Sequence, residues 1–285
     1  MARILVASPI NNRAWVLPTM LRCLKKLKVN EGDTLDFYFV ENDSTDESWE
    51  ILWDWSAKGN SCTLVQAHLE EPLYERDLKH KEPFQRLAKL REGLREYAIK
   101  QDYDYLLSVD SDILVRPDTY LALQAHGVPF VGASVWNPGG LPFRAINAWD
   151  FGPKPVPLTI GDPPRWSYFK YTGSGLTPVG LTGACFLATR DCLERASYLY
   201  DFNNNSQSIF QGHKEVFYED KVFAVSCIDA GIQQYLDQDH RVWHCWKPEL
   251  LEQFLEFEAT HKKRTVQRLA DKAWETGLGV GKSIV

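Results

Sequence analysis

The chain has 285 residues, which is long for one hydrophobic core but acceptable for a single α/β domain with insertions. Its 38 acidic residues against 32 basic residues argue against a nucleic-acid partner, because phosphates require a basic face. No apolar run approaches the length that crosses a bilayer, and the run from Ile4 to Val6 is too short for a secretory signal. We therefore expect a cytoplasmic protein.

The cysteines are scattered along the chain without Cys-x-x-Cys spacing. In a chain without a secretory signal this pattern predicts reduced, mostly buried thiols, and it does not indicate a zinc site. The six residues are Cys23, Cys62, Cys185, Cys192, Cys227 and Cys245.

Strands and helices are predicted to alternate up to residue 110. Helices are indicated by leucines spaced from Leu17 to Leu27, by the capping-box spacing of Ser44 and Glu47, and by the apolar face from Leu87 to Tyr97. Apolar runs predict strands at 4–8 (ending at Pro9), 35–40, 62–67 and 103–110. This alternation predicts parallel βαβ units, whose ligands bind outside the carboxyl ends of the strands.

The second half has a different character. A strand is predicted at 129–135, but 137–178 is rich in Gly and Pro and predicts one long acceptor-side loop, with Trp149 and Trp166 as acceptor contacts or a lid. Regular structure is expected again at 180–189, as a helix from Glu219 to about Ala230, at 241–246, and as a final helix from Leu250 to Phe257.

The most informative motif is Asp110-Ser111-Asp112, at the end of a buried strand. Two carboxylates one residue apart suit a divalent cation that bridges to a diphosphate. The alternative is a solvated turn, because Asp and Ser are ordinary turn residues. The acidic segment that starts at Glu41 also follows a strand, and this coincidence favours a functional site at the strand ends.

The ordered set of motifs resembles the GT-A-fold glycosyltransferases, most closely the family-2-like group that uses nucleotide diphosphate sugars, with some likeness to Anp1-type mannosyltransferases. The likeness covers roughly residues 3–246. The motifs are Ala7-Ser8-Pro9, Val40-Glu-Asn-Asp-Ser-Thr-Asp46, Asp110-Ser-Asp112, Gly183-Ala-Cys-Phe, Glu219-Asp220 and His244.

The resemblance implies a fold and a domain plan. It implies a GT-A-like (Rossmann-like) mixed, mainly parallel sheet flanked by helices in a single domain over 1–246. The nucleotide-binding half would be about 1–115 and the acceptor half about 116–246, with a helix and tail at 247–285 packed on the same domain.

The resemblance also implies roles for individual residues. Ala7, Ser8, Glu41 and Asp110 match nucleotide-binding positions, with Glu41 on the base. Asp110, Asp112 and His244 match the metal shell of Mn²⁺ or Mg²⁺, and an imidazole ligand favours Mn²⁺. Asp220, with Glu219 beside it, matches the general base of inverting members.

One basic position departs from the family pattern. Leu90-Arg91 precedes Glu92-Gly93 where these enzymes usually carry Arg-Asn ahead of the glycine. The basic contact to the nucleotide is therefore assigned to Arg91, with Arg86 and Lys89 as alternatives. The likeness to retaining Anp1-type enzymes leaves open whether the product is inverted or retained.

The resulting expectation is an enzyme that transfers a hexose from a UDP- or GDP-linked sugar to a carbohydrate, lipid-linked or protein acceptor. Two alternatives stay open: a sugar-phosphate nucleotidyltransferase, and a non-catalytic carbohydrate-binding protein with a degenerate transferase fold. The basic cluster His261-Lys-Lys-Arg264 is either a solvated face or a peripheral contact with an anionic membrane surface.

Overall fold

The computed structural model describes residues 1–69, 82–136, 148–151, 166–168, 174–208, 210–211 and 219–275. The chain divides into two compact units, Met1–His244 and Cys245–Val285. The second unit contains helix α7 (Pro248–Glu275), which extends well beyond the predicted final helix. Its packing on the first unit stays a prediction. In the described part of the chain, no helix combines the length and apolar composition that crossing a membrane requires.

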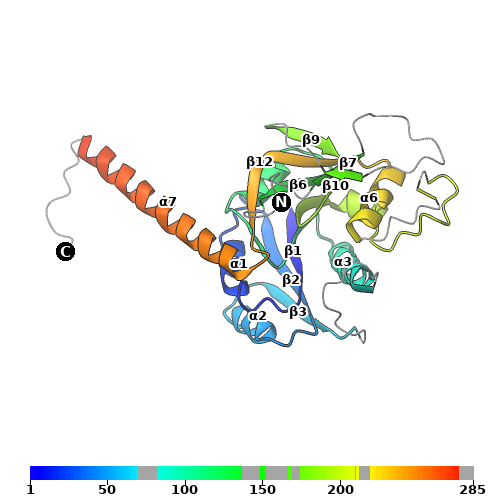
Figure 1. Ribbon diagram of the computed structural model, residues 1–285, viewed down its shortest axis with the longest axis horizontal. Helices are drawn as coiled ribbons and strands as arrows, with labels where there is room; N and C mark the ends of the chain where they lie inside the picture. Colours follow the sequence, from blue (N-terminus) through cyan, green and yellow to red (C-terminus); the bar gives the residue numbers. More distant parts are fainter. Residues whose placement is uncertain are drawn as a thin grey trace. The chain divides into compact units, whose positions relative to one another are not determined.

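The predicted alternation of strands and helices in the first half is confirmed. Helices α1 and α2 lie on one side of the parallel strands β1, β2 and β3, and helix α3 lies on the other (Figure 1). The elements are β1 (Arg3–Ile10), α1 (Leu17–Leu24), β2 (Thr34–Asn42), α2 (Ser48–Ala57), β3 (Cys62–Ala67), α3 (Glu82–Lys100) and β4 (Tyr105–Val109).

The second half contains more strands than the sequence predicts. The expected loop at 137–178 includes strands β7, β8 and the start of β9. Strand β7 pairs with both β8 and β10, and the three form a small antiparallel sheet. Short aromatic segments form these strands: in register, Trp149 is opposite Tyr168 and Phe151 is opposite Trp166. Their Gly- and Pro-rich surroundings conceal this pattern, and the side chains of Trp149 and Trp166 lie outside the described part. The elements are β5 (Ile113–Leu114), α4 (Thr119–Gln124), β6 (Phe130–Trp136), β7 (Ala148–Phe151), β8 (Trp166–Tyr168), β9 (Leu176–Val179), β10 (Leu181–Thr182), β11 (Cys185–Thr189), α5 (Arg190–Arg195), α6 (Glu219–Asp229) and β12 (Gln234–His244).

The main sheet has the strand order β3-β2-β1-β4-β11-β6-β12-β5, and β9 pairs with β12. Strands β3, β2, β1 and β4 are parallel, β11 is antiparallel to both of its neighbours, and β6 is parallel to β12. The chain first moves outward from β1 to β3 and then crosses back to place β4 on the other side of β1. The carboxyl ends of β1 and β4 therefore form a topological switch point, where ligands of open α/β sheets bind.

The start of helix α2 corrects the predicted capping box. The helix begins at Ser48, and its N-cap residue, Glu47, makes no side-chain capping bond. Ser44 instead accepts a hydrogen bond from the backbone N–H of Asn12 (2.9 Å), and Asp46 accepts one from the N–H of Ser48 (3.0 Å). Ser44 thus binds the loop after β1 rather than the helix, and Asp46 binds both that loop, at Ala14, and the first residue of the helix.

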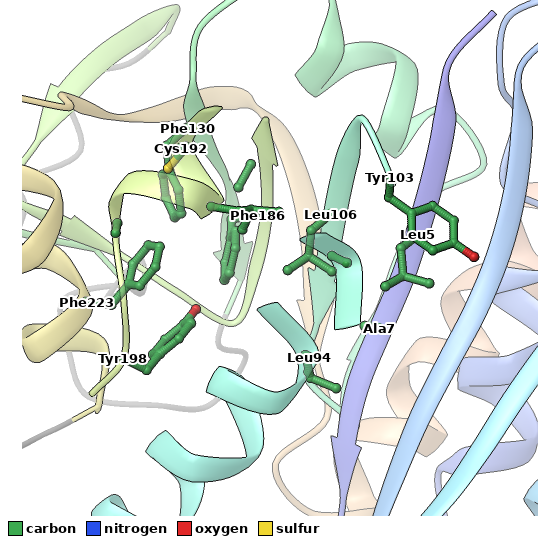
Figure 2. Close-up of a cluster of buried hydrophobic side chains, with 14 of the residues drawn as sticks. Leu5, Ala7, Leu94, Tyr103, Leu106, Phe130, Phe186, Cys192, Tyr198 and Phe223 are labelled. Carbon is green, nitrogen blue, oxygen red and sulfur yellow. The ribbon is translucent and has the colours of Figure 1, made fainter. Parts of the chain in front are cut away.

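A buried apolar cluster joins the sheet to the helices on the α3 side (Figure 2). Phe130 of β6 stacks on Phe186 of β11 with ring centroids 4.6 Å apart, and Tyr198 stacks on Phe223 of α6 at 4.3 Å. Leu94 of α3 belongs to the same cluster. Aromatic burial of this kind is a large stabilising contribution, so the cluster fixes α3 and α6 against the sheet.

Candidate functional site

The site is built at the switch point by segments that are far apart in the sequence. Asp110 and Asp112 form the turn between β4 and β5, which closes with a hydrogen bond from the N–H of Ile113 to the carbonyl of Asp110 (2.9 Å). Arg13 follows β1. His244 ends β12, where it is paired in register with Ile113 of β5. The turn is thereby held between the two halves of the sheet.

Asp112 is contacted on both carboxylate oxygens. Nε2 of His244 lies 3.4 Å from Oδ1, and Nη2 of Arg13 donates to Oδ2 at 3.2 Å. Only 6% of Asp112 is exposed, less than its place at a strand end predicts. Burial alone would raise the pKa of Asp112, but the hydrogen bond from His244 and the charges of His244 and Arg13 lower it below the ordinary value. Asp112 is therefore an anion at neutral pH.

Asp110 has a different partner. Nη2 of Arg91, on helix α3, donates to Oδ1 of Asp110 at 2.6 Å, and Arg91 is only 3% exposed. Burial raises the pKa of Asp110, although Arg91 opposes the shift. Burial would also lower the pKa of Arg91, but Asp110 and Asp220 outweigh it, and the pKa stands well above the ordinary value. In this pair the guanidinium of Arg91 is buried, whereas 29% of the Asp110 side chain is exposed.

Arg91 also links Asp110 to helix α6. Its Nε lies 3.9 Å from Oε1 of Glu219, the first residue of the helix, and neither Nε nor Nη1 has a hydrogen-bond partner within the described ranges. Glu219 is buried, and burial followed by the charge of Asp220 raises its pKa. Asp220 is partly exposed, and its carboxylate lies against Gly183, where an added Cβ would be 2.7 Å from Oδ2.

The predicted metal shell is brought together only in part. Neighbouring ligands of an octahedral ion with ligand distances near 2.1 Å are about 3 Å apart, close to the 3.4 Å between Asp112 and His244. A carboxylate and an imidazole also form a suitable donor set for Mn²⁺. Asp110, however, is turned to Arg91, and over the described ranges no three His, Cys, Asp or Glu residues form a metal-binding group. The residues fit a cation whose other ligands come from the substrate and water.

The predicted nucleotide contacts from β1 and β2 are enclosed by protein. Ala7 and Ser8 have no exposed surface, because β1 continues to Ile10 and does not end at Pro9. Glu41 is 2% exposed, and its Oε1 accepts a hydrogen bond from the N–H of Ser44 at 2.6 Å. Its observed role is to hold the loop after β2, and contact with a nucleotide base stays a prediction.

Two arginines at the site carry contacts that the sequence analysis did not assign. Arg13 lies on Asp112, and Arg86 of α3 pairs with Asp43 after β2. For Arg13 the available signal was the polar run Asn11-Asn12-Arg13, which directly follows a strand of the nucleotide-binding half. The strand ends two residues later than the sequence predicts, so this run lies directly after its last residue. For Arg86 the sequence offers only a place as an alternative to Arg91.

Comparisons with known proteins identify the fold. No protein-family model matches the chain, and no curated protein matches it significantly. Among solved structures, S. aureus TarS is 15% identical, with a TM-score of 0.50 over 87% of this chain and 38% of that chain. TarS 1–349 in complex with UDP is 15% identical, with a TM-score of 0.48 over 87% and 62%. The mannosyltransferase PcManGT from Pyrobaculum calidifontis, in complex with GDP-Man and Mn²⁺, is 14% identical, with a TM-score of 0.48 over 85% and 56%.

These matches cover only part of each matched structure. The chain spans 38 to 62% of the length of the three matched structures. At 15% identity, the match to TarS shows the fold: a GT-A-like, mixed and mainly parallel sheet flanked by helices. The expected fold class is therefore confirmed. The reaction must be argued from the site.

Proposed function

We propose that the chain is a metal-dependent glycosyltransferase that moves a hexose from a UDP- or GDP-linked sugar to an acceptor hydroxyl. The observation that carries this proposal is the meeting of Asp112 with His244, beside the contact of Asp110 with Arg91, at the switch point of a GT-A-like sheet. Nucleotide ligands bind at this position in open α/β sheets.

The donor side of the site is assigned to the aspartates. Asp112 and His244 would hold Mn²⁺ or Mg²⁺ together with the diphosphate, and a bound cation supplies Lewis-acid stabilisation of the charge that develops on the leaving diphosphate. Arg91 donates a hydrogen bond to Oδ1 of Asp110 and thereby orients the carboxylate. We assign its second oxygen, Oδ2, to the donor.

The acceptor side is assigned to Asp220. A general base must be ionised and must reach the acceptor hydroxyl. Glu219 is buried and its pKa is raised, so it tends to keep its proton, whereas Asp220 is partly exposed. This contrast favours Asp220 as the base of an inverting reaction. A retaining reaction of the Anp1 type requires no such base. The acceptor is a carbohydrate, lipid-linked or protein hydroxyl.

The test is a screen of UDP- and GDP-linked sugars with Mn²⁺, Mg²⁺ or EDTA. Release of the nucleoside diphosphate is measured by chromatography and donor binding by titration calorimetry. We expect metal-dependent binding and slow release without an acceptor. Asp112→Asn should lose both, and the matched control Asp118→Asn, whose side chain is 46% exposed and paired with Arg116, should keep both.

Other results would replace the proposal. Release of pyrophosphate in the presence of a sugar phosphate and a nucleoside triphosphate would identify a nucleotidyltransferase. Binding of sugars without any binding of nucleoside diphosphates would identify a carbohydrate-binding protein. Equal donor affinity in EDTA and in Mn²⁺ would remove the metal from the proposal.

A further inference from the structure

Each aspartate of the Asp110-Ser111-Asp112 turn is paired with one arginine, and the two pairs differ in kind. Arg91 is 3% exposed and its contact with Asp110 is 2.6 Å long. The side chain of Arg13 is 26% exposed and its contact with Asp112 is 3.2 Å long. The first contact is the shorter. In the first pair the partly exposed partner is the carboxylate, with 29% of the Asp110 side chain exposed, and in the second pair it is the guanidinium of Arg13.

The backbone of Arg13 is fixed while its guanidinium is held weakly. The N–H of Arg13 donates to Oγ of Ser48 at 2.8 Å, and the next residue, Ala14, donates to Asp46 at 2.9 Å. By contrast, the hydrogen bonds that Nη1 of Arg13 makes to described residues are long, at 3.4 Å to the carbonyl of Asn11 and 3.3 Å to that of Asn12. Its buried Nε has no hydrogen-bond partner among the residues described. The side chain can therefore change partner without moving the loop.

The present contact of Arg13 conflicts with a cation on Asp112. A metal bound by Asp112 and His244 would stand within a few ångströms of the guanidinium, and like charges at that distance repel one another even in a partly exposed site. An arginine displaced from a carboxylate needs another anion, and its planar fork fits two phosphate oxygens as well as it fits a carboxylate.

We propose that Arg13 is an exchangeable counter-ion, which neutralises Asp112 before the cation binds and then moves to the diphosphate of the donor. The proposal rests on the proposed function. It makes metal and nucleotide binding interdependent: Arg13 weakens binding of the metal alone and strengthens binding of the nucleoside diphosphate with the metal. Such coupling is reciprocal, so each ligand must raise the affinity for the other.

The experiment measures the two affinities separately in Arg13→Gln. Mn²⁺ binding without nucleotide is followed by electron paramagnetic resonance of free Mn²⁺. Binding of UDP and GDP at saturating Mn²⁺ is followed by calorimetry. We expect Mn²⁺ alone to bind several-fold more tightly than to wild type, and the nucleoside diphosphate to bind roughly tenfold more weakly, as for loss of one charge-assisted contact.

Two further variants make the outcome specific. Arg13→Lys keeps the positive charge beside Asp112 but loses the fork, so Mn²⁺ affinity should stay near wild type while nucleoside diphosphate binding falls. Arg116→Gln removes an exposed arginine, paired with Asp118 at 2.8 Å, and should leave both affinities unchanged. Thermal melts of each variant establish that it is folded.

The outcomes separate this inference from the proposed function. If wild type binds the nucleoside diphosphate with Mn²⁺, but Arg13→Gln binds Mn²⁺ alone no more tightly, the exchange does not occur and the glycosyltransferase proposal survives. A parallel fall of both affinities in Arg13→Gln would mean that Arg13 only supports the loop. If wild type binds neither ligand, the proposed function itself fails.

Discussion

The carboxylate of Asp220 rests against the backbone of Gly183, because a Cβ added at Gly183 would lie 2.7 Å from Oδ2 of Asp220. The neighbouring residue Ala184, which has a positive φ of 64°, accepts a hydrogen bond from the backbone N–H of Asp110 at 2.7 Å. The turn before β11 therefore touches both the residue assigned to the acceptor and the turn assigned to the donor. Glycine at 183 allows the carboxylate to lie this close.

Gly183→Ala should displace the carboxylate of Asp220 and lower kcat by about 10- to 100-fold, as small misplacements of catalytic groups do. Only the end of a flexible side chain must move, so the melting temperature and the donor Kd should change little. Gly93→Ala is the matched control, because an added Cβ there meets nothing within 4 Å. An unchanged kcat in Gly183→Ala would separate Asp220 from the chemistry.

Asp220→Asn should lower kcat by about 10²- to 10⁴-fold if the reaction inverts, since it removes the general base. Donor affinity should barely change, because the base contacts the acceptor. Glu219→Gln should have a milder effect. The required data are donor Kd, kcat and the anomeric configuration of the product. A retained anomer would remove the need for this base and favour the Anp1-type alternative.

Glu219→Gln should stabilise the protein at alkaline pH and have little effect at acid pH. Burial, followed by the charge of Asp220, raises the pKa of Glu219 from 4.5 to about 8. Below pH 4.5 the residue is protonated in both states. Between 4.5 and 8 only the unfolded chain loses the proton, so the stability of wild type falls as pH rises. Melting temperatures of both proteins from pH 4 to 9 test this, and a difference that does not grow with pH would contradict it.

Arg91→Met should destabilise the fold, because Asp110 loses its partner. About 3–5 kcal/mol, the cost of breaking a fully buried pair, is the upper limit, since 29% of the Asp110 side chain is exposed. Arg91→Lys keeps the charge but not the fork, so stability should recover in part while donor affinity stays reduced. Arg116→Met, at an exposed ion pair, should behave as an ordinary surface change. Denaturant unfolding with calorimetry checks all three. If the unfolding free energy of Arg91→Met equals that of wild type, Arg91 does not stabilise the fold through Asp110 or Glu219.

The sequence predicts the fold well where local pattern and tertiary structure agree. Strand β3 follows from its apolar run and the core-facing side of α3 from helical periodicity, and the ends of β4 and α6 are predicted within a residue. The prediction fails where long-range bonds override local ones: Ser44 binds Asn12, 32 residues away, and so does not cap α2. Small strands such as β7 depend on partners that no local pattern reveals.

The resemblance predicts that Asp110, Asp112, Glu219 and His244 lie near one another, but it does not predict their pairing. The structure brings the elements that carry them to one edge of the sheet, and their roles stay predictions. The pairing of Arg91 with Asp110, and of Arg13 with Asp112, depends on how α3 and the loop after β1 pack. The sequence does not identify these partners, because any nearby arginine would neutralise either aspartate equally well.

The antiparallel strand β11 gives its half of the sheet a freedom that the parallel half lacks. Strand β11 begins at Cys185, opposite Val109 at the end of β4, and it runs back along β6, with Phe186 opposite Gly132. The end of β6 and the start of β11 therefore lie at the same end of the sheet as the site. The loop-closure free energy of a connection between two strands rises by only about 0.6 kcal/mol per doubling of its length. Length changes in the segment between β6 and β11 leave the main sheet in place if they avoid β9, which pairs with β12, and the residues Gly183 and Ala184, which contact the site. Under the proposed function, exchanging the other parts between related chains is a direct route to a new acceptor preference on an unchanged donor site.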